Sequence, residues 1–373
     1  MKLLIISDKP TQFDAPFFRY ITASDTSINL HLLYTSTSYS LYDPELLQNI
    51  SWGVNLLEGY THTVLTTRNR FLQLCTLIRS SNYIIISGYS SLPAIIAYVL
   101  CFLLHKRCAI RLDTVDWHNQ SRIKLALYKK PLFKVLNVIC CHFLACGNRT
   151  HNFLTMVNIK EEKINRFPYI VDTNWFATTS VLSVEGKQKL KQTLQIPAGN
   201  IIILAVTKLN SRESPFDLLN ALALMTHQRV TVVIIGDGEN KPDLIKLSNT
   251  LPPTKQVIFL GYVPYTSLPS YYGIADLFVH PVQDEPWGVS VQEAMACRLP
   301  VITSNFVGAG YDLIKPGENG FMYSFGQPHD LAQRADEALD LTNEQVNQTN
   351  CSILQFWSYD TLWNELRTLI LEN

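Results

Sequence analysis

The sequence predicts an α/β protein made of two doubly wound, parallel-sheet domains. The chain has 373 residues, which exceeds the roughly 100–200 residues of one ordinary domain. Hydrophobic residues make up 47% of it, enough for large cores. Short β-branched runs alternate with helix-length amphipathic segments in both halves, a pattern typical of parallel strands joined by crossover helices. We therefore expect two domains, each with its own sheet.

Each half contains its own series of apolar runs. Those of the first half predict strands, with helices between several of them, at Leu3–Ser7, Asn29–Leu33, Tyr83–Ser87, Ala109–Leu112 and Val138–Ala145. The second half starts afresh, with strands expected at Ile201–Val206, Val230–Gly236, Val257–Gly261, Asp276–Pro281 and Pro300–Ser304. The second series is long enough for a complete second sheet.

The segment Arg166–Phe176 is the expected hinge, because its proline ends a helix and an extended stretch follows. We expect domains at residues 1–170 and 171–355, and a C-terminal helix at 356–373 that packs back on the first domain. Ligands of doubly wound sheets bind outside the carboxyl ends of the strands. Two such domains facing each other would therefore form a cleft.

Charge and cysteine content narrow the classes of partner. Thirty-one basic residues balance thirty-one acidic ones, so no global field attracts nucleic acid, and an anionic ligand must be held by local groups. The eight cysteines form no CxxC pair and the opening "MKLLIIS" is typical of a strand, which favours a cytoplasmic location. The run Cys140–Cys146 is apolar, and buried cysteine behaves as a small hydrophobe; no metal site is expected.

The uncharged stretch Leu92–Leu104 is too short for a membrane span, which needs roughly 18–20 apolar residues. We expect a buried helix. The stretch is followed by basic residues, at Lys106, Arg107 and in the segment Tyr128–Lys134. Two interpretations of these residues stay open. They could make peripheral contact with the cytoplasmic membrane face, or form a solvated basic face beside the helix.

The run "DEPWGVSVQEAMACRLPVITS", Asp284–Ser304, carries the most chemistry. Pro286 and Gly288 suit a helix entry, so a helix is expected from Val289 to about Cys297. A helix entry presents unpaired N–H groups and the positive end of the helix dipole, which together bind phosphate. Backbone amides from Trp287 to Ser290 could supply these donors.

Two glutamates flank this entry, Glu285 in the loop and Glu293 inside the helix. With a diphosphate at the entry, one carboxylate could accept hydrogen bonds from a donor sugar and the other from a ribose. Taken alone, Glu285 is more typical of a solvated loop residue and Glu293 of an exposed helix residue than either is of a binding site.

The surrounding residues resemble a known family. Glu285-Pro286-Trp287-Gly288, Glu293-Ala294-Met295-Ala296-Cys297 and Pro300-Val301-Ile302 look like the E-x7-E signature of family 4 retaining glycosyltransferases, which have the GT-B fold of two Rossmann-like domains. The similarity extends over most of the second half through "YYGIADLFVHP", "VGAGYDLIKPGENGF", "GDGE" and "FPYIVD". In the first half "TQFDAPFFR", "SGYSS" and "RLDTVD" resemble the family less specifically.

The resemblance implies roles on the donor side. Glu285 would contact the donor sugar, Glu293 the ribose, and Lys208 the diphosphate. The remaining donor-binding residues implied are Trp287, Gly288 and Val289 around the phosphates, Gly236, Asp237 and Gly238 in the "GDGE" loop, and Tyr262 and Val263 near the base. "GDGE" alone is typical of an ordinary turn.

The sequence departs from the family pattern at one cation. A lysine usually follows about five positions after the residue that Lys208 matches, and here Glu213 stands there, beside Arg212. That cation stabilises the charge that develops on the leaving phosphate. Either Arg212 takes the role, since a guanidinium grips phosphate with two hydrogen bonds, or activity is weak or lost.

Acceptor-side residues are expected at strand ends of the first domain. Asp113 comes at the end of the strand Ala109–Leu112, and we expect it to have a catalytic role near the reacting sugar. The other candidates are Asp8, Gln12 and Asp14 after the first strand, Tyr89 in "SGYSS", and His118. Capping or surface roles explain each of these residue types equally well.

Together these features predict a retaining, metal-independent glycosyltransferase without a cofactor. It would move a hexose or related sugar from a nucleoside diphosphate to a glycan or lipid-linked saccharide, in polysaccharide or glycoconjugate synthesis. A weak or inactive nucleotide-sugar-binding scaffold is the alternative that Glu213 keeps open, while the glutamate pair argues against a GT-B epimerase. The sequence has no G-x-G-x-x-G or G-K-[ST] loop, which argues against nicotinamide, flavin and ATP-hydrolysing enzymes.

Overall fold

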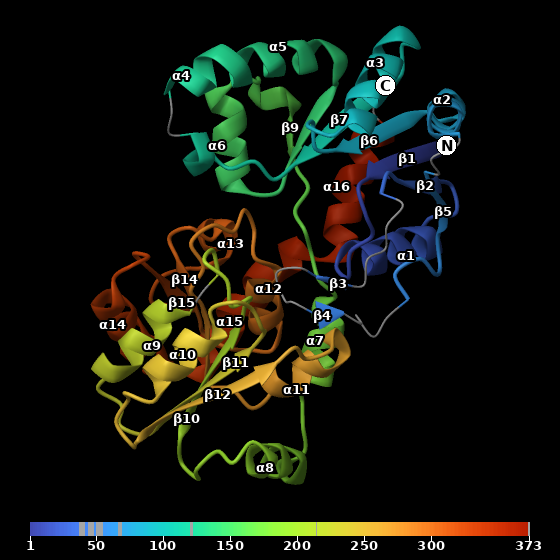
Figure 1. Cartoon of the computed structure of the whole chain (residues 1–373). Coiled ribbons are helices and arrows are strands. Elements are labelled where there is room, and N and C mark those ends of the chain that lie inside the picture. Colours follow the sequence, from blue (N-terminus) through green and yellow to red (C-terminus); the bar gives the residue numbers. More distant parts are fainter. Residues whose placement is uncertain are drawn as a thin grey trace. The chain divides into compact units, whose positions relative to one another are not determined.

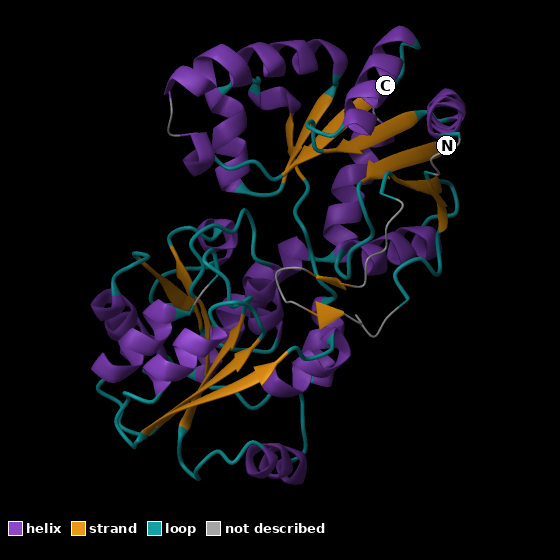
Figure 2. Ribbon diagram, viewed as in Figure 1, coloured by secondary structure: helices purple, strands orange, loops and turns teal. Residues whose placement is uncertain are grey.

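The computed structural model describes residues 1–36, 42–43, 48–49, 55–65, 69–119, 122–213 and 215–371 (Figure 1). The chain divides into two compact units. Unit 1 comprises Met1–Tyr39, Asn55–Val171 and Tyr359–Asn373, and unit 2 comprises Ser40–Val54 and Asp172–Ser358. Each unit has a parallel sheet with helices on both faces (Figure 2). The cleft between two facing domains stays a prediction.

The described part of unit 1 holds a seven-stranded parallel sheet in the order β5-β2-β1-β6-β7-β8-β9. Its strands are β1 Lys2–Ser7, β2 Asn29–Tyr34, β5 Thr61–Val64, β6 Tyr83–Ser87, β7 Arg107–Leu112, β8 His142–Ala145 and β9 Ile164–Arg166. The chain moves outward from β1 in one direction first and then in the other. The switch point therefore lies between β1 and β6, where ligands of such sheets bind.

Helices cover both faces of this sheet. Their bounds are α1 Asp14–Ser24, α2 Arg70–Ser80, α3 Leu92–Leu103, α4 Arg122–Lys124, α5 Lys130–Ile139, α6 Asn148–Met156 and α16 Tyr359–Leu371, with a π-helical turn at Leu125–Lys129 and 3₁₀ turns at Asp116–Asn119 and Glu161–Lys163. Apolar side chains of α2, α3, α5 and α6 share one core. The core on the opposite face contains Phe17 and Ile21 of α1 with Leu362 and Leu366 of α16.

In unit 2 the described residues form a six-stranded parallel sheet in the order β12-β11-β10-β13-β14-β15. Its strands are β10 Ile201–Val206, β11 Val230–Ile235, β12 Lys255–Gly261, β13 Leu277–His280, β14 Val301–Ser304 and β15 Gly320–Tyr323. A short antiparallel pair joins β3 Tyr42–Asp43 to β4 Gln48–Asn49. The winding reverses between β10 and β13, so a ligand is expected at the ends of these two strands.

The helices of unit 2 also lie on both faces of its sheet. They are α7 Thr173–Thr179, α8 Val184–Thr193, α9 Phe216–Leu224, α10 Lys241–Ser248, α11 Leu268–Tyr272, α12 Val289–Ala296, α13 Gly308–Leu313, α14 Pro328–Leu339 and α15 Asn343–Leu354, with 3₁₀ turns at Tyr265–Ser267 and Gln355–Trp357. Apolar residues of α9, α10 and α14 form the core against one face. Helix α12 packs against α7, α13 and α15. None of the described helices has both the length and the apolar composition of a membrane span.

The structure corrects three expectations. The run Val138–Ala145 is not one strand, because α5 continues to Ile139 and the strand begins at His142. The C-terminal helix, expected from residue 356, begins at Tyr359, after the 3₁₀ turn Gln355–Trp357. Helix α3 is buried on only one side, and Leu92 and Leu103 are 69% and 64% exposed. The absence of charged residues predicts a helix buried on all sides. A helix that covers a sheet, however, buries only the side that faces the sheet.

Candidate functional site

The candidate site of unit 2 lies at its switch point, where the loops after β10 and β13 are joined. The N–H of Gln283 donates to the carbonyl oxygen of Arg212 over 2.8 Å. The Arg212 guanidinium donates to the carbonyl oxygen of Asp284 over 3.4 Å. Arg212 therefore lies against the residue that precedes Glu285, although the two are far apart in sequence.

Glu213 forms part of the loop after β10. Its side chain is buried, and its carboxylate accepts a hydrogen bond from the N–H of Lys208 over 3.1 Å and from the Arg212 guanidinium over 2.5 Å. The Asn210 side-chain oxygen accepts from the N–H groups of Arg212 and Glu213 over 3.0 and 2.9 Å. The Arg212 side chain keeps 41% of its surface exposed. Glu213 thus orients the Arg212 guanidinium, and the positive charge of Arg212 offsets the negative charge of the Glu213 carboxylate.

Helix α12 begins at the same edge of the sheet. Gly288 adopts φ +101°, a conformation that favours glycine. The preceding loop is anchored to the loop after β14, because the N–H of Glu285 donates to the carbonyl of Phe306 over 3.0 Å and Gly308 N–H donates to the carbonyl of Glu285 over 2.9 Å. The anchoring fixes the direction of the Val289 and Ser290 amides, which have no acceptor within their own helix.

Trp287 supplies packing at this helix entry. Its side chain is buried and its ring centroid lies 5.0 Å from that of Trp357. The indole therefore forms part of the core, and the backbone of Trp287 is what borders the helix entry with Gly288 and Val289. The two aromatic rings hold the entry against the end of α15 and the turn that follows it.

Glu293 lies inside α12 and is only 4% exposed. The Tyr272 hydroxyl donates to its Oε2 over 2.8 Å. Burial raises the pKa of Glu293 to about 7, and the hydrogen bond from Tyr272 opposes this rise. The carboxyl group therefore changes its protonation near neutral pH, unlike an exposed glutamate.

Replacing Tyr272 by Phe should remove the hydroxyl that donates to Glu293 while keeping the ring. We expect the free energy of unfolding to fall by about 1 kcal/mol, the net value of a typical buried hydrogen bond. The loss should be larger above pH 7 than below it, because the ionised carboxylate depends more on the donor. Chemical denaturation at two pH values measures both effects, and an equal loss at the two values would contradict this account.

His280 is a site residue that the sequence analysis did not single out. It ends β13, and a Cβ placed on Gly288 would lie 3.5 Å from its Cδ2 and 3.5 Å from Cγ of Glu285. Burial, followed by the charge of Arg212, lowers the pKa of His280 to about 4. Its Nε2 has no hydrogen-bond partner among the described residues. A neutral imidazole thus lies beside the helix entry. In the sequence His280 belongs to "YYGIADLFVHP", which resembles the family but assigned this histidine no role.

The "GDGE" loop packs tightly against the loop after β10. A Cβ on Gly236 would lie 1.9 Å from the carbonyl oxygen of Thr207, so this approach requires glycine. The Asp237 carboxylate accepts from the N–H of Gly238 over 2.9 Å and from Lys241 over 2.8 Å. Tyr262 and Val263, both half-buried, follow β12 at the same edge of the sheet. The loops that carry all donor-side candidates therefore share one sheet edge.

In unit 1, Asp14 and Arg111 form a buried ion pair with 2.9 Å between Oδ1 and Nη2. The Arg111 guanidinium lies over the Phe167 and Tyr169 rings, at 4.7 and 4.4 Å from their centroids. The Tyr169 hydroxyl donates to Oδ2 of Asp113 over 3.1 Å. Asp14 and Asp113 are thus linked through one network, and Asp113 is the more exposed of the two.

The remaining acceptor-side candidates lie near strand ends of the same unit. Asp8 is exposed after β1 and accepts from the Thr35 hydroxyl over 3.1 Å. Tyr89 follows β6; its hydroxyl lies 3.1 Å from that of Thr114 and accepts from Lys129, whose ammonium is 4.7 Å from the ring centroid. Gln12 is half-buried before α1. The side chain of His118 lies outside the described residues.

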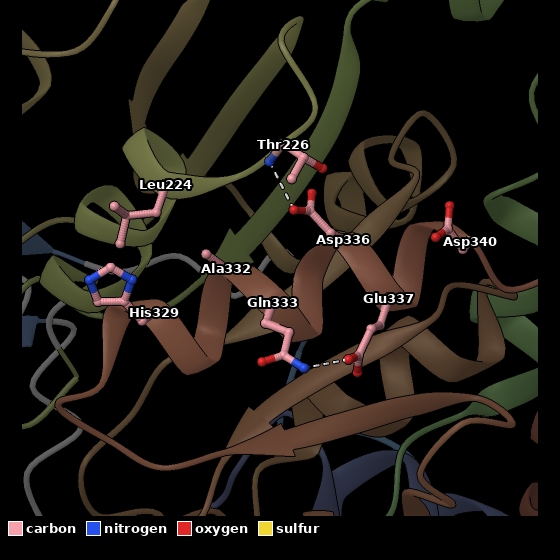
Figure 3. A pocket seen from close by; sticks show the side chains of 8 residues that line it. All are labelled: Leu224, Thr226, His329, Ala332, Gln333, Asp336, Glu337 and Asp340. Carbon is pink, nitrogen blue, oxygen red and sulfur yellow. Dashed lines mark hydrogen bonds between the residues drawn. The ribbon is translucent and has the colours of Figure 1, made fainter.

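No group of three His, Cys, Asp or Glu side chains within the described ranges is arranged to hold a metal ion. A shallow pocket lies between α9 and α14 and is lined by Leu224, Thr226, His329, Ala332, Gln333, Asp336, Glu337 and Asp340 (Figure 3). Thr226 precedes β11, whose amino end is therefore close. The loops after β10 and β13, by contrast, follow the carboxyl ends of their strands.

Comparison with known proteins gives a consistent result for unit 2. Residues 186–352 match the family model of glycosyl transferases group 1. An uncharacterized glycosyltransferase of Methanocaldococcus jannaschii is 28% identical over 49% of this chain and 48% of its own length. An alpha-monoglucosyldiacylglycerol synthase of Acholeplasma laidlawii is 28% identical over 45% and 43%. These matches show that unit 2 is similar to glycosyltransferases. They span less than half the length of either relative.

Solved structures extend the likeness to the whole chain. HepE of Anabaena, solved in complex with UDP, has a TM-score of 0.76 at 18% identity and 99% coverage of both chains. A glycosyltransferase of Rickettsia africae has a TM-score of 0.75 at 16% identity, with 100% of this chain and 99% of that chain covered. These likenesses concern the fold, and they confirm the predicted class of two parallel-sheet domains of GT-B type.

Proposed function

We propose that the protein is a retaining glycosyltransferase of the E-x7-E type that takes its sugar from a nucleoside diphosphate. One observation carries the proposal: at the switch point of unit 2, Arg212, Glu285 and the entry of α12 are held together by the hydrogen bonds of Gln283 and Asp284. A cation, a carboxylate and unpaired helix amides are what a sugar diphosphate requires. HepE of Anabaena was solved with UDP and with UDP-glucose, which supports a nucleotide-sugar donor.

Each donor-side group then has a defined task. The amides at Gly288 and Val289 hold the diphosphate, and Lys208 and Arg212 balance its charge. Glu285 accepts from hydroxyls of the transferred sugar, and Glu293 accepts from the ribose. The base lies near Tyr262 and Val263. The cations and the helix dipole provide the stabilisation that a metal ion would otherwise supply.

Retention of configuration follows if the acceptor attacks from the face that the diphosphate leaves. The acceptor oxygen bonds to the anomeric carbon as the bond to the phosphate oxygen breaks, and the acceptor proton passes to the leaving phosphate. The enzyme then needs no nucleophile of its own. Asp113 of unit 1 is the residue proposed to orient the acceptor, a glycan or a lipid-linked saccharide. The similarity of unit 2 to an alpha-monoglucosyldiacylglycerol synthase of Acholeplasma laidlawii supports the proposal of a lipid-bearing acceptor.

The scaffold alternative rests on Glu213 in place of a lysine. The contacts of Glu213 weigh against it, since its carboxylate is occupied by the Lys208 N–H and the Arg212 guanidinium. A paired carboxylate repels a diphosphate far less than an unpaired one. We therefore propose Arg212, whose side chain is 41% exposed, as the second cation of an active enzyme.

A panel of nucleotide sugars tests the proposal directly. We expect one nucleotide sugar to bind, as measured by isothermal titration calorimetry, and its nucleoside diphosphate to be released when a lipid-linked saccharide is added. Lys208→Ala should weaken binding about tenfold through loss of a charge-assisted contact. The matched variant Lys246→Ala, at an exposed lysine of α10, should bind normally. Binding without release of the nucleotide under any acceptor would favour the scaffold.

A further inference from the structure

Unit 1 presents an apolar surface that its core does not use. Thirteen of the twenty-two exposed large hydrophobic side chains among the described residues lie between Phe71 and Val138, so the exposure is concentrated in one part of the fold. Soluble monomers rarely expose contiguous apolar patches larger than a few hundred Å². Such a concentration indicates an interaction surface.

Helix α3 contributes one continuous stripe. Leu92, Ile95, Val99 and Phe102 follow one another at helical spacing and are 46–69% exposed. The opposite side of the helix, with Ala94, Ala97, Tyr98 and Cys101, is buried in the core of unit 1. The exposed stripe therefore faces away from the sheet.

The segment from α4 to α5 contributes the second stripe. Its exposed apolar side chains are Ile123, Leu127, Tyr128, Leu132, Val135 and Val138. Phe133 and Leu136 of α5 enter the same core as α3, and the two helices contact each other. Figure 1 shows α3 and α5 on the same side of the unit 1 sheet. We call the exposed apolar side chains of residues 92–103 and 123–138 the apolar face.

The charge around the apolar face is one-sided. The whole chain is neutral, yet residues 59–160 contain thirteen Lys and Arg and only two acidic residues, Asp113 and Asp116. Both aspartates have partners, since Asp113 accepts from Tyr169 and Asp116 pairs with Arg149. Lys124 and Lys134 lie exposed on the same segments as the apolar side chains. The surface is thus apolar and basic at once.

We propose that the apolar face docks unit 1 onto a bilayer that contains anionic lipids. Apolar side chains on helices that lie along a membrane enter the headgroup region, while flanking lysines attract anionic headgroups. A second copy of the chain fits this surface less well, because an isologous contact would bring the same basic residues against each other. Nucleic acid fits less well too, because phosphates offer nothing to the aliphatic side chains.

Vesicle co-sedimentation of the full chain tests this proposal. Vesicles of phosphatidylcholine mixed with phosphatidylglycerol should bind the protein, and binding should weaken as salt is added. Vesicles of phosphatidylcholine alone should bind it much less. The variant Ile95→Gln/Val99→Gln/Phe102→Gln should lose about tenfold or more in affinity for the mixed vesicles, because fewer apolar groups enter the membrane. The variant Lys124→Gln/Lys134→Gln should bind less and show a smaller salt dependence.

Exposed apolar side chains of unit 2 provide the matched control, Val181→Gln/Val184→Gln/Ile245→Gln, which should bind like the unchanged protein. Circular dichroism of all variants verifies the fold. Equal binding to both kinds of vesicle, or an apolar-face variant that binds like the control, overturns the proposal. So does a dimer in sedimentation velocity that the apolar-face variant converts to a monomer. The assay needs no nucleotide sugar, so its outcome is independent of the proposed transfer reaction.

Discussion

Replacing Arg212 by alanine should lower the turnover of sugar transfer by about 10²–10³-fold while changing nucleotide affinity much less. The reason is that charge grows on the leaving phosphate as the sugar departs, and a fixed cation there stabilises the transition state more than the ground state. Glu213 and the carbonyl of Asp284 already orient the guanidinium, so no reorganisation is needed at the moment of reaction. Steady-state kinetics with saturating donor would measure the effect.

Glu213 should act through Arg212 as a positioning residue. We expect Glu213→Ala to reduce turnover, and the double variant Arg212→Ala/Glu213→Ala to be no slower than Arg212→Ala alone. The matched control is Arg229→Ala, at an exposed arginine just before the amino end of β11. Additive effects of the two substitutions would contradict the positioning role. A Glu213→Lys variant that gains activity would show that Arg212 does not replace the missing lysine.

Most strands of the two sheets could be predicted, because they are runs of apolar, β-branched residues, which are typical of buried strands. Strand order was not predictable, since it depends on which runs pair over long separations. The short strands β5, β9 and β15 were not predicted from the sequence. The outward side of α3 was misread, because composition does not reveal which side of a helix a sheet will cover.

The donor side was predicted by motif, but its local chemistry required the structure. Glu213 looks like a lost cation in the sequence, whereas its hydrogen bonds with Lys208 and Arg212 make it part of the loop. Tyr272 and His280 lie in the stretch "YYGIADLFVHP" that resembles the family, but no role was assigned to them, because a tyrosine in a helix and a histidine at a strand end are ordinary core residues. Only their distances to Glu293 and to the entry of α12 relate them to the site.

Glu293 should make the folded protein less stable as the pH rises. Its pKa is about 7 in the folded chain, against an ordinary value of 4.5. The folded state therefore binds this proton more tightly than the unfolded state, and its contribution to stability is fully present below about pH 4.5 and is lost as the pH rises through 7. The loss amounts to about 3 kcal/mol, the free energy that corresponds to the shift.

Glu293→Gln removes the charge and keeps an oxygen that can accept from Tyr272. Relative to the unchanged protein, the variant should gain up to about 3 kcal/mol at pH 8.5 and nearly nothing at pH 4.5, as calorimetry of the ligand-free proteins at the two pH values would measure. The exposed Glu318→Gln should show no such dependence.

Glu293→Gln should also bind the nucleotide about tenfold more weakly, because a neutral amide accepts weaker hydrogen bonds from the ribose than a carboxylate does. If Glu293→Gln is more stable and binds the nucleotide normally, Glu293 is not part of the site. If it is more stable but binds the nucleotide more weakly, the ribose hydroxyls replace the hydrogen bonds to water that the carboxylate loses on burial.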